Sequence, residues 1–349
     1  MATEQTVPRR DGSTSRVRSL GARLVLPVLF GVAVIALGAG LATAKANPTR
    51  IGAGVVVIET SLNGGTAEGT GMVLTSSGRV LTNNHVIRGA TAIRIVLPGT
   101  GRSYTANVLG YSVSKDVAVL RARGASNLKK VSLGNSSTVR VGQVVKATGN
   151  AGGRGTLTSS TGRVTALRRA ITVSDEDGGR RLTGLIETSS ELEPGDSGGP
   201  LFDLAGKVIG MNTAATVGYA FRSTRGADGY AIPINAAISI AKQIISGKAS
   251  ESVHVGDTPF LGVSIGSNDT GSSRAVVASV VPGSAADAAG LASGDVITSF
   301  GGRAISSPAK LRSAILRAKP GARVSVIYVD ATTGARESAT VTLGSGPPQ

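Results

Sequence analysis

The 349-residue sequence contains no cysteine and no tryptophan, and aromatic residues make up only 3% of it. The absence of cysteine excludes disulfide bonds, cysteine-ligated zinc and a thiol nucleophile, in whichever compartment the chain resides. Only two histidines are present, His85 and His254, and no His-Glu-x-x-His motif occurs. The usual zinc-protease site is therefore excluded, and we expect no metal and no other cofactor.

Small aliphatic side chains must therefore build the core. Hydrophobic residues make up 41% of the sequence, and 49 glycines interrupt it. This composition is typical of many short strands joined by tight turns. The formal net charge is +16, but the basic residues occur as scattered pairs without interleaved aromatic residues. Such a surface suits an acidic cell envelope and does not indicate specific binding of nucleic acid.

The N-terminal region combines a basic segment with an apolar one. Residues 1–23 carry five arginines and two acidic residues, so we expect a flexible cytoplasmic tail. Residues 24–44 are 21 residues without a charge, enough to cross the ~30 Å hydrocarbon layer as a helix. A signal peptide cleaved near Ala44 or Ala46 is the competing interpretation, although its apolar core would usually span about 7–15 residues. We therefore predict a single-pass anchor, a linker over 45–50, and an exported remainder of the chain.

Residues 51–247 contain a succession of short β-type runs cut by Gly, Ser and Asn, without helical periodicity before Pro233. Antiparallel strands at this spacing are typical of barrels or sandwiches, and the length suits two small barrels of about 90 residues each. After Pro233, apolar residues at helical spacing continue until Gly247. We expect this helix to close the unit by packing on the second barrel.

A second unit follows a polar stretch. Residues 248–258 are polar and aperiodic, which indicates a linker to a unit at 259–345. That unit combines strand patterns with one helix predicted over 308–318, with Ser306 and Ser307 as its caps. The last four residues, 346–349, have the sequence Gly-Pro-Pro-Gln, and we expect them to form a disordered tail.

Three short segments supply the groups that acyl transfer by a serine requires. His85 follows the strand pattern Leu-Thr-Asn-Asn, Asp116 opens Asp-Val-Ala-Val-Leu, and Ser197 lies in the turn Gly-Asp-Ser-Gly-Gly-Pro. The serine needs a base to take its proton and a carboxylate to orient that base. Because His254 lies in the polar linker, His85 is the sole candidate base. The backbone N–H groups of Gly195 and Ser197 would stabilise the oxyanion.

The segments TNNHVI, DVAVL and ELEPGDSGGPL resemble the catalytic segments of the chymotrypsin-fold serine proteases, and in particular those of the bacterial HtrA (Deg) branch. The order His, Asp, Ser is also the order of that fold. The resemblance implies a mainly β protein, in which a chymotrypsin-like double β-barrel precedes an α+β PDZ domain. It also implies a homo-oligomer, since such relatives commonly form trimers.

The residue before the serine departs from this resemblance. Many HtrA proteins carry Asn there, whereas Asp196 matches the digestive-type enzymes, in which this carboxylate pairs with a newly cut N-terminal amine. No obvious activation cleavage site precedes Ile51. We therefore expect Asp196 to find a local backbone or side-chain partner.

The primary pocket is the second departure. Glu191 lies six residues before the serine, where enzymes of this fold that cut after Lys or Arg place an acid. Leu192 keeps the apolar wall of the HtrA relatives, so we expect cleavage after Val, Ile, Ala or Leu, with cleavage after a basic residue as the alternative. The residues expected at the pocket and at the edge strand beside it are Glu191, Leu192, Asn212, Thr213 and Ala214.

In the second unit, FLGV resembles the carboxylate-binding loop of PDZ domains, and GLASGDVITSFGGRAI resembles their most recognisable stretch. A peptide C-terminus would add as a strand beside FLGVSI, against the predicted helix. The residues that the resemblance assigns to this groove are Phe260, Leu261, Gly262, Val263, Leu311 and Ile315. Ordinary core packing is the alternative for the last two.

The sequence thus predicts a membrane-tethered, extracytoplasmic serine endopeptidase that cleaves misfolded or signalling proteins and binds peptide C-termini through its PDZ domain. A chaperone or binding protein with a weakly active protease scaffold is the alternative, and the intact triad argues against it. The glycine-rich stretch 149–155 lacks the spacing of a nucleotide site and precedes no helix. We interpret it as a loop near the active site.

Overall fold

The structure is a computed structural model, and it describes residues 52–173, 180–213, 229–266 and 274–349. The predicted basic tail, anchor and first linker, residues 1–50, lie outside the described residues. Within the described ranges, no helix is both long enough and apolar enough to cross a membrane.

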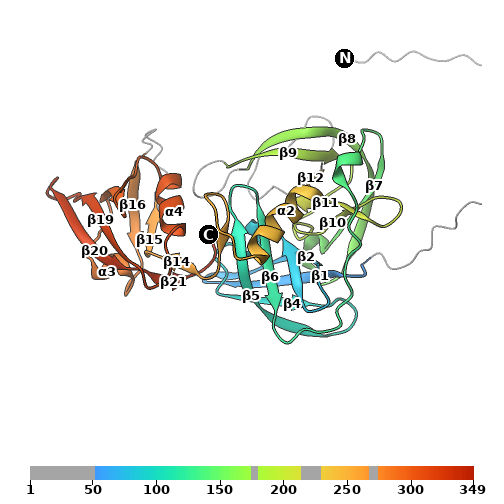
Figure 1. The fold of residues 1–349 in the computed structure, drawn as a ribbon, viewed down its shortest axis with the longest axis horizontal. Coiled ribbons are helices and arrows are strands. Elements are labelled where there is room, and N and C mark those ends of the chain that lie inside the picture. The colour runs from blue at the N-terminus through green and yellow to red at the C-terminus, as the bar shows by residue number, and fades with distance from the viewer. Residues whose placement is uncertain (1–51, 174–179, 214–228, 267–273) are drawn as a thin grey trace, which may run out of the picture. The chain divides into compact units, whose positions relative to one another are not determined.

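The first barrel is drawn in blue to green in Figure 1. Its sheet runs in the order β13-β5-β4-β1-β2-β3-β6, and pairing of β5 with β6 closes it. A short helical turn, α1 (Asn84–Ile87), follows β3. The strands of the barrel are β1 (Val55–Leu62), β2 (Gly65–Val73), β3 (Arg79–Thr82), β4 (Ala92–Val96), β5 (Ser103–Ser112) and β6 (Val117–Ala122).

The second barrel closes in the order β10-β11-β12-β9-β8-β7, so the prediction of two small barrels is confirmed. Short 3₁₀ turns, η1 (Ser136–Thr138) and η2 (Ala151–Gly153), flank β7. The strands are β7 (Val144–Gly149), β8 (Thr158–Val173), β9 (Arg180–Thr188), β10 (Pro200–Phe202), β11 (Val208–Thr213) and β12 (Gly229–Pro233).

Side chains of the first barrel belong to two hydrophobic clusters, because alternate side chains of a strand point to opposite faces of the sheet. Val80 and Leu120 are paired across β3 and β6 and lie in the interior of the first barrel. Their neighbours Leu81 and Val119, also paired, lie in a second cluster that includes side chains of the second barrel, such as Met211. We call this second cluster the shared core.

The helix predicted after Pro233 is α2 (Ile234–Ile245). Its buried residues are Ile234, Ala237, Ala241 and Ile244, all members of the shared core. The helix contacts β11 of the second barrel but also β5 and β6 of the first. The prediction of a closing helix that packs on the second barrel is confirmed, and the helix also packs on the first barrel, because the shared core extends across both barrels.

The second globular unit is drawn in orange to red in Figure 1. Its main sheet runs β15-β16-β17-β19-β20, with β18 beside β17, and β14 pairs separately with β21. The strands are β14 (Thr258–Phe260), β15 (Val263–Ile265), β16 (Ala275–Val280), β17 (Val296–Phe300), β18 (Arg303–Ala304), β19 (Arg323–Val329), β20 (Arg336–Thr342) and β21 (Gly344–Gly346). The helices are α3 (Ala285–Ala288) and α4 (Pro308–Leu316), and Lys310 N–H donates to the predicted cap Ser307 Oγ over 3.2 Å.

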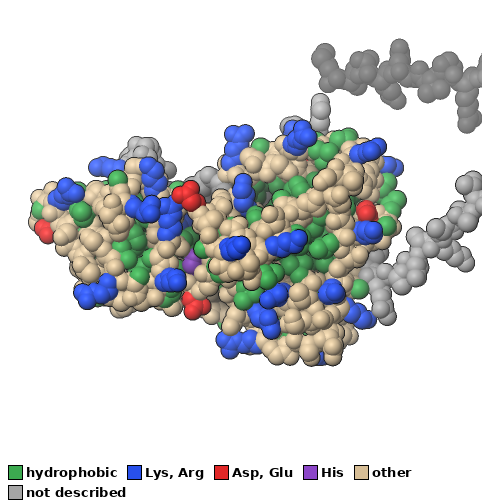
Figure 2. Space-filling model, in the orientation of Figure 1, with side chains coloured by type: hydrophobic (Ala, Val, Ile, Leu, Met, Phe, Trp, Pro, Cys, Tyr) green, Lys and Arg blue, Asp and Glu red, His purple; other side chains and the backbone are tan. Residues whose placement is uncertain are grey.

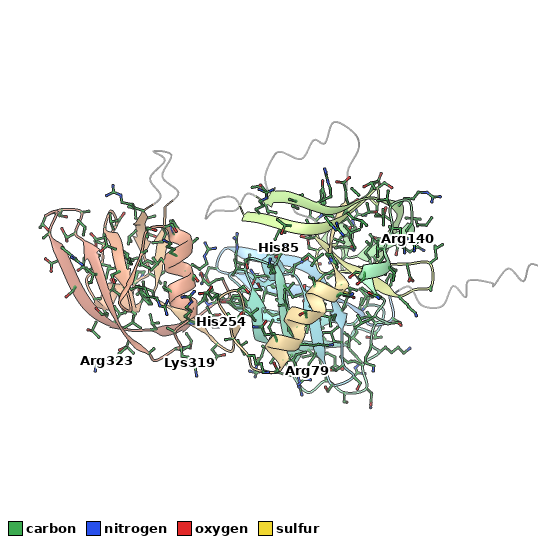
Figure 3. The ribbon with its side chains drawn as sticks, turned by 45° about the horizontal axis from the view of Figure 1, so that its top comes forward. Arg79, His85, Arg140, His254, Lys319 and Arg323 are labelled. Atoms are coloured by element: carbon green, nitrogen blue, oxygen red, sulfur yellow. The ribbon has the colours of Figure 1, made fainter. Side chains whose placement is uncertain are left out.

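The predicted linker 248–258 is more ordered than its polar sequence indicates. His254 and Val255 form β13 and pair with β5 of the first barrel. The His254 ring, labelled in Figure 3, is buried with both nitrogens 3.1 Å from carbonyl oxygens, those of Leu316 and Asp257. A strand of two residues is too short to produce a periodic pattern.

The prediction of a disordered tail at 346–349 is wrong. Gly346 pairs with Thr258 in the short β14–β21 ladder. Pro348 O accepts a hydrogen bond from Gly89 N–H over 2.8 Å, and Gln349 O accepts one from Asn84 Nδ2 over 2.9 Å. These donors lie at α1, so the tail is ordered by partners distant in sequence.

Candidate active site

The pairing of β3 with β6 brings His85 and Asp116 together. Thr82, at the end of β3, lies opposite Ala118 in β6, so the turn after β3 meets the turn before β6. His85 Nδ1 lies 2.8 Å from Asp116 Oδ2, and the His85 backbone N–H donates to Asp116 Oδ1 over 3.0 Å (Figure 3 labels His85). The carboxylate thus contacts the histidine through both oxygens. A proton on Nδ1 satisfies this contact and leaves Nε2 as the basic nitrogen.

The Asp116 side chain is fully buried, while that of His85 keeps 27% of its surface exposed. A buried carboxylate requires compensating donors. Asp116 has at least three: the two N–H groups of His85 and the Thr213 hydroxyl, which lies 3.2 Å from Oδ2. Asn83 Nδ2 also donates to the Asp116 carbonyl over 2.9 Å, and Asp116 adopts a φ of 54°, a left-handed conformation that Asp tolerates. The carboxylate is therefore fixed in one orientation.

Ser197 lies in the turn that enters β10, and the turn is held from several sides. Thr70 N–H donates to the Ser197 carbonyl over 2.8 Å, and the Thr70 hydroxyl donates to the Gly195 carbonyl over 2.6 Å. Asn212 exchanges backbone hydrogen bonds with Gly198 and Gly199 over 2.9 and 2.7 Å. Because Thr70 belongs to the first barrel and Asn212 to the second, both barrels position the serine turn.

The turn also requires glycine at position 195. Gly195 has a φ of 100°, which side chains rarely adopt, and a Cβ atom there would collide with the carbonyl oxygen of Asn150. Glycine therefore permits the close approach of the stretch 149–155 to the serine turn. The prediction that this glycine-rich stretch lies near the serine turn is confirmed.

Asp196 has the local backbone partner that the sequence predicts. Its Oδ2 accepts a hydrogen bond from the Glu193 N–H over 2.9 Å, and its side chain is buried. Burial raises the pKa of the Asp196 carboxyl, the hydrogen bond from Glu193 opposes this shift, and the negative charge of Glu193 adds to it. The carboxylate is thus held without a newly cut N-terminal amine.

The predicted pocket residues Glu191 and Leu192 lie in different environments. Leu192 is half-buried against the interior of the second barrel, and a Cβ atom on Gly229 would lie 2.9 Å from its Cγ. Glu191 is exposed, and its backbone N–H donates to Ser160 Oγ over 3.0 Å. Sequence reasoning missed Gly229, whose small size makes room for the Leu192 side chain. Ala214 lies outside the described residues.

Asn212 and Thr213 do not present their side chains to a pocket. Asn212 is fully buried, and its Nδ2 lies 3.3 Å from the Thr148 carbonyl and 3.2 Å from the Pro200 carbonyl. Thr213 donates to the Asp116 carboxylate. The side chains of both residues thus belong to the scaffold, and the role of this stretch as the edge strand beside the pocket stays a prediction.

In the second globular unit, β15 lies at the edge of its sheet. Gly262 has a φ of 87°, its carbonyl accepts from Val281 N–H over 2.8 Å, and the Leu261 carbonyl accepts from Ala286 N–H over 2.9 Å. Leu261 and Leu311 are buried in the core of the unit, which confirms the core-packing alternative for Leu311. The less buried predicted groove residues are Phe260, Val263 and Ile315.

Comparisons with known proteins agree with this arrangement. The model of the trypsin-like peptidase domain family matches residues 69–211, and that of the PDZ domain family matches residues 259–342. The chain is 36% identical over 305 residues to the serine protease PepD of Mycobacterium tuberculosis, and this match covers 83% of this chain and 63% of PepD. It is 35% identical over 269 residues to the periplasmic pH-dependent serine endoprotease DegQ of Escherichia coli, and this match covers 73% of this chain and 55% of DegQ.

The chain thus spans less than two thirds of the length of these relatives. Among solved structures, the HtrA-type protease AlgW with tripeptide is 29% identical and superposes with a TM-score of 0.51. That superposition covers 88% of this chain and 98% of the AlgW chain.

Proposed function

Since the chain belongs to the HtrA-type trypsin-like serine proteases with one PDZ domain, we propose that it is an extracytoplasmic endopeptidase in which Ser197, His85 and Asp116 perform acyl transfer. The observation that carries this proposal is the contact of both Asp116 carboxylate oxygens with His85, at 2.8 and 3.0 Å. A histidine held in this way has one tautomer and one orientation, which general-base catalysis requires.

In the first step, Ser197 Oγ attacks the scissile carbonyl carbon while His85 Nε2 takes the hydroxyl proton. The carbonyl oxygen becomes an oxyanion, which the N–H groups of Gly195 and Ser197 stabilise. Asp116 remains ionised and stabilises the imidazolium ion. Its burial strengthens this interaction, because water does not compete for the carboxylate.

The intermediate then collapses to an acyl-enzyme, and His85 donates its proton to the leaving amine. Water, deprotonated by the same nitrogen, attacks the ester carbonyl. His85 then returns this proton to Ser197 Oγ as the ester bond breaks, which releases the second product and free Ser197. No metal or other cofactor takes part in this sequence of steps.

Hydrolysis of casein by the full-length chain in detergent, with Ser197→Ala as the control, tests the proposal. We expect casein to be cleaved by the unsubstituted chain and to remain intact with the variant. If neither protein cleaves casein and both suppress its aggregation equally, the chain is a chaperone with a protease scaffold, and the proposed function is wrong.

For specificity, we propose cleavage after Val, Ile, Ala or Leu. The half-buried Leu192 supports an apolar pocket, and the exposed position of Glu191 argues against an acid at the base of the pocket. Sequencing the peptides released from an unfolded protein tests this preference. Dominant cleavage after Lys or Arg would contradict it.

We propose that the PDZ domain binds peptide C-termini by adding them as a strand to β15. The edge position of β15 and the left-handed Gly262 loop support this mode, since an added strand needs an unpaired edge. The roles of Phe260, Val263 and Ile315 in the groove belong to this proposal. Titration with a fluorescent peptide, with and without a blocked C-terminal carboxylate, tests it.

For location and assembly, we propose export, a membrane anchor at residues 24–44, misfolded or signalling proteins as substrates, and a homo-oligomeric state. The basic residues spread over the face in Figure 2, without one dominant patch, suit an anionic envelope. Membrane fractionation tests the anchor, and light scattering after size exclusion tests the assembly.

A further inference from the structure

The glycine-rich turn η2 contacts the peptide bond that carries the proposed oxyanion donor. Gly152 N–H, in this turn, donates to the carbonyl oxygen of Pro194 over 2.8 Å. The Pro194 carbonyl and the Gly195 N–H belong to the same peptide plane. In a trans peptide these two groups point in opposite directions. A carbonyl held by Gly152 therefore directs the Gly195 N–H away from η2, to the other side of the serine turn.

Asn150, the residue just before η2, fixes the position of this turn through its hydrogen bonds. Asn150 is fully buried, and its backbone N–H donates to Thr70 Oγ1 over 2.9 Å. Its carbonyl accepts from Gly153 N–H over 2.9 Å, which closes the turn. Its side-chain Nδ2 donates to Glu68 Oε2 over 2.6 Å. Glu68 and Thr70 both belong to β2 of the first barrel, so the first barrel holds a turn of the second.

We propose, on the basis of the proposed function, that Glu68 is a positioning residue for the oxyanion donor. The connection runs from the Glu68 carboxylate to Asn150, through η2 to the Gly152 N–H, and from there to the Pro194 carbonyl. Glu68 contacts no reacting atom in this arrangement. It fixes the turn whose hydrogen bond orients the Gly195 N–H, and a hydrogen bond to an ionised carboxylate is about twice as strong as a neutral one.

The location of Glu68 favours this role over a contribution to folding. Glu68 is exposed on β2, and it lies directly opposite Glu59 of β1. Like charges at directly opposed positions destabilise a strand pair. Glu59 is paired with Arg94 over 3.2 Å, whereas Glu68 directs its carboxylate to Asn150. Removal of Glu68 therefore relieves repulsion in the sheet while it releases η2.

The experiment compares three variants of the full-length chain in detergent. Glu68→Ala removes the acceptor for Asn150 Nδ2, and Glu68→Gln keeps an amide oxygen in its place. Glu59→Ala is the matched control, because it removes the same charge from the opposed position of the same strand pair without a contact to η2. For each protein we would measure kcat and KM on a peptide substrate, the Ki of a peptide aldehyde, and the thermal midpoint.

For Glu68→Ala we expect kcat to fall about 5- to 30-fold, less than the about 10²–10³-fold loss caused by removing a whole oxyanion donor. KM should change less than about twofold, and the aldehyde Ki should rise by the factor by which kcat/KM falls, because the aldehyde adduct forms an oxyanion. Glu68→Gln should stay within about threefold of the unsubstituted kcat, since a neutral acceptor retains part of the hydrogen bond. Glu59→Ala should match the unsubstituted chain, and no variant should lower the thermal midpoint.

The inference is overturned if Glu68→Ala retains kcat within twofold, if Glu59→Ala loses as much activity, or if the loss follows a fall in thermal midpoint. In those cases Ser197-dependent hydrolysis by the unsubstituted chain still stands, and so does the proposed function. If the unsubstituted chain shows no Ser197-dependent hydrolysis at all, the proposed function is wrong and this inference falls with it.

Discussion

Replacement of Asp116 by Asn changes one oxygen into an NH₂ group at a site where both oxygens accept hydrogen bonds. Oδ1 faces the His85 backbone N–H, which remains a donor at every pH, and Oδ2 faces His85 Nδ1. If the asparagine oxygen stays with the backbone N–H, its NH₂ group faces Nδ1. The ring proton must then move to Nε2, the atom that has to accept the Ser197 proton.

The opposite orientation keeps the productive tautomer but places the asparagine NH₂ against the His85 backbone N–H. Two buried donors then lack acceptors, at about 1–3 kcal/mol each. The productive orientation is therefore disfavoured by about 2–6 kcal/mol, which corresponds to a loss of kcat of about 30-fold to about 3 × 10⁴-fold. We expect the measured loss to fall in this range, with KM almost unchanged.

Two measurements check this reasoning on Asp116→Asn. Steady-state hydrolysis of a peptide gives the loss of kcat. Nitrogen-15 NMR of the imidazole rings gives the tautomer, and the spectrum is simple because the chain has only two histidines, His85 and His254. The unsubstituted protein should show Nδ1–H at His85, and the variant should show Nε2–H. A variant that keeps kcat within about fivefold, or that keeps the Nδ1–H tautomer while inactive, would refute the argument.

Three further outcomes are expected. Burial raises the pKa of Asp196, so the folded protein binds the proton more readily, and the free energy of unfolding should fall as pH rises from about 4 through that raised pKa. In chemical denaturation, Asp196→Asn should abolish this dependence of the free energy of unfolding on pH. The variant should keep its activity, since an amide oxygen still accepts a hydrogen bond from the Glu193 N–H. A folded but inactive variant would mean that Asp196 has a catalytic role. Thr70→Val leaves the Gly195 carbonyl without its donor and the Asn150 N–H without its acceptor, so we expect the free energy of unfolding to fall by about 1–3 kcal/mol for each group. We also expect kcat to fall, and an unchanged kcat would contradict this. Gly262→Ala forces a left-handed conformation, which by itself costs about 1–2 kcal/mol, and its Cβ would also collide with the Ser284 side chain. Peptide binding to the PDZ domain should therefore weaken while hydrolysis of a short peptide persists, and equal loss of both would contradict separate sites.

The segments of the candidate active site can be recognised in the sequence because their information is local. His85, Asp116 and Ser197 each lie within a short run whose residue types are required together, and the order of the runs matches the fold. The strand patterns and glycine-rich turns also predict the two barrels that the structure contains. These features depend on residues adjacent in the chain.

The features that the sequence did not predict depend on distant partners. Which side chains of β11 point inward cannot be read from its sequence, because all six of its residues are buried, and the contact of Thr213 with Asp116 was therefore not predicted. The contact between Glu68 and Asn150 joins residues 82 positions apart, and that between Thr70 and Gly195 joins residues 125 apart. No local pattern marks such pairs.

The shared core has a consequence for how the enzyme responds to strain. His85 and Asp116 belong to the first barrel and Ser197 to the second, so the alignment of the proposed catalytic residues depends on how the two barrels pack against each other. Val119 lies in the shared core, whereas its neighbour Leu120 lies inside the first barrel. We expect a cavity at Leu120 to weaken the first barrel alone, and a cavity at Val119 to loosen the packing of the two barrels against each other. We therefore expect packing far from any reacting atom to affect the rate of the proposed reaction.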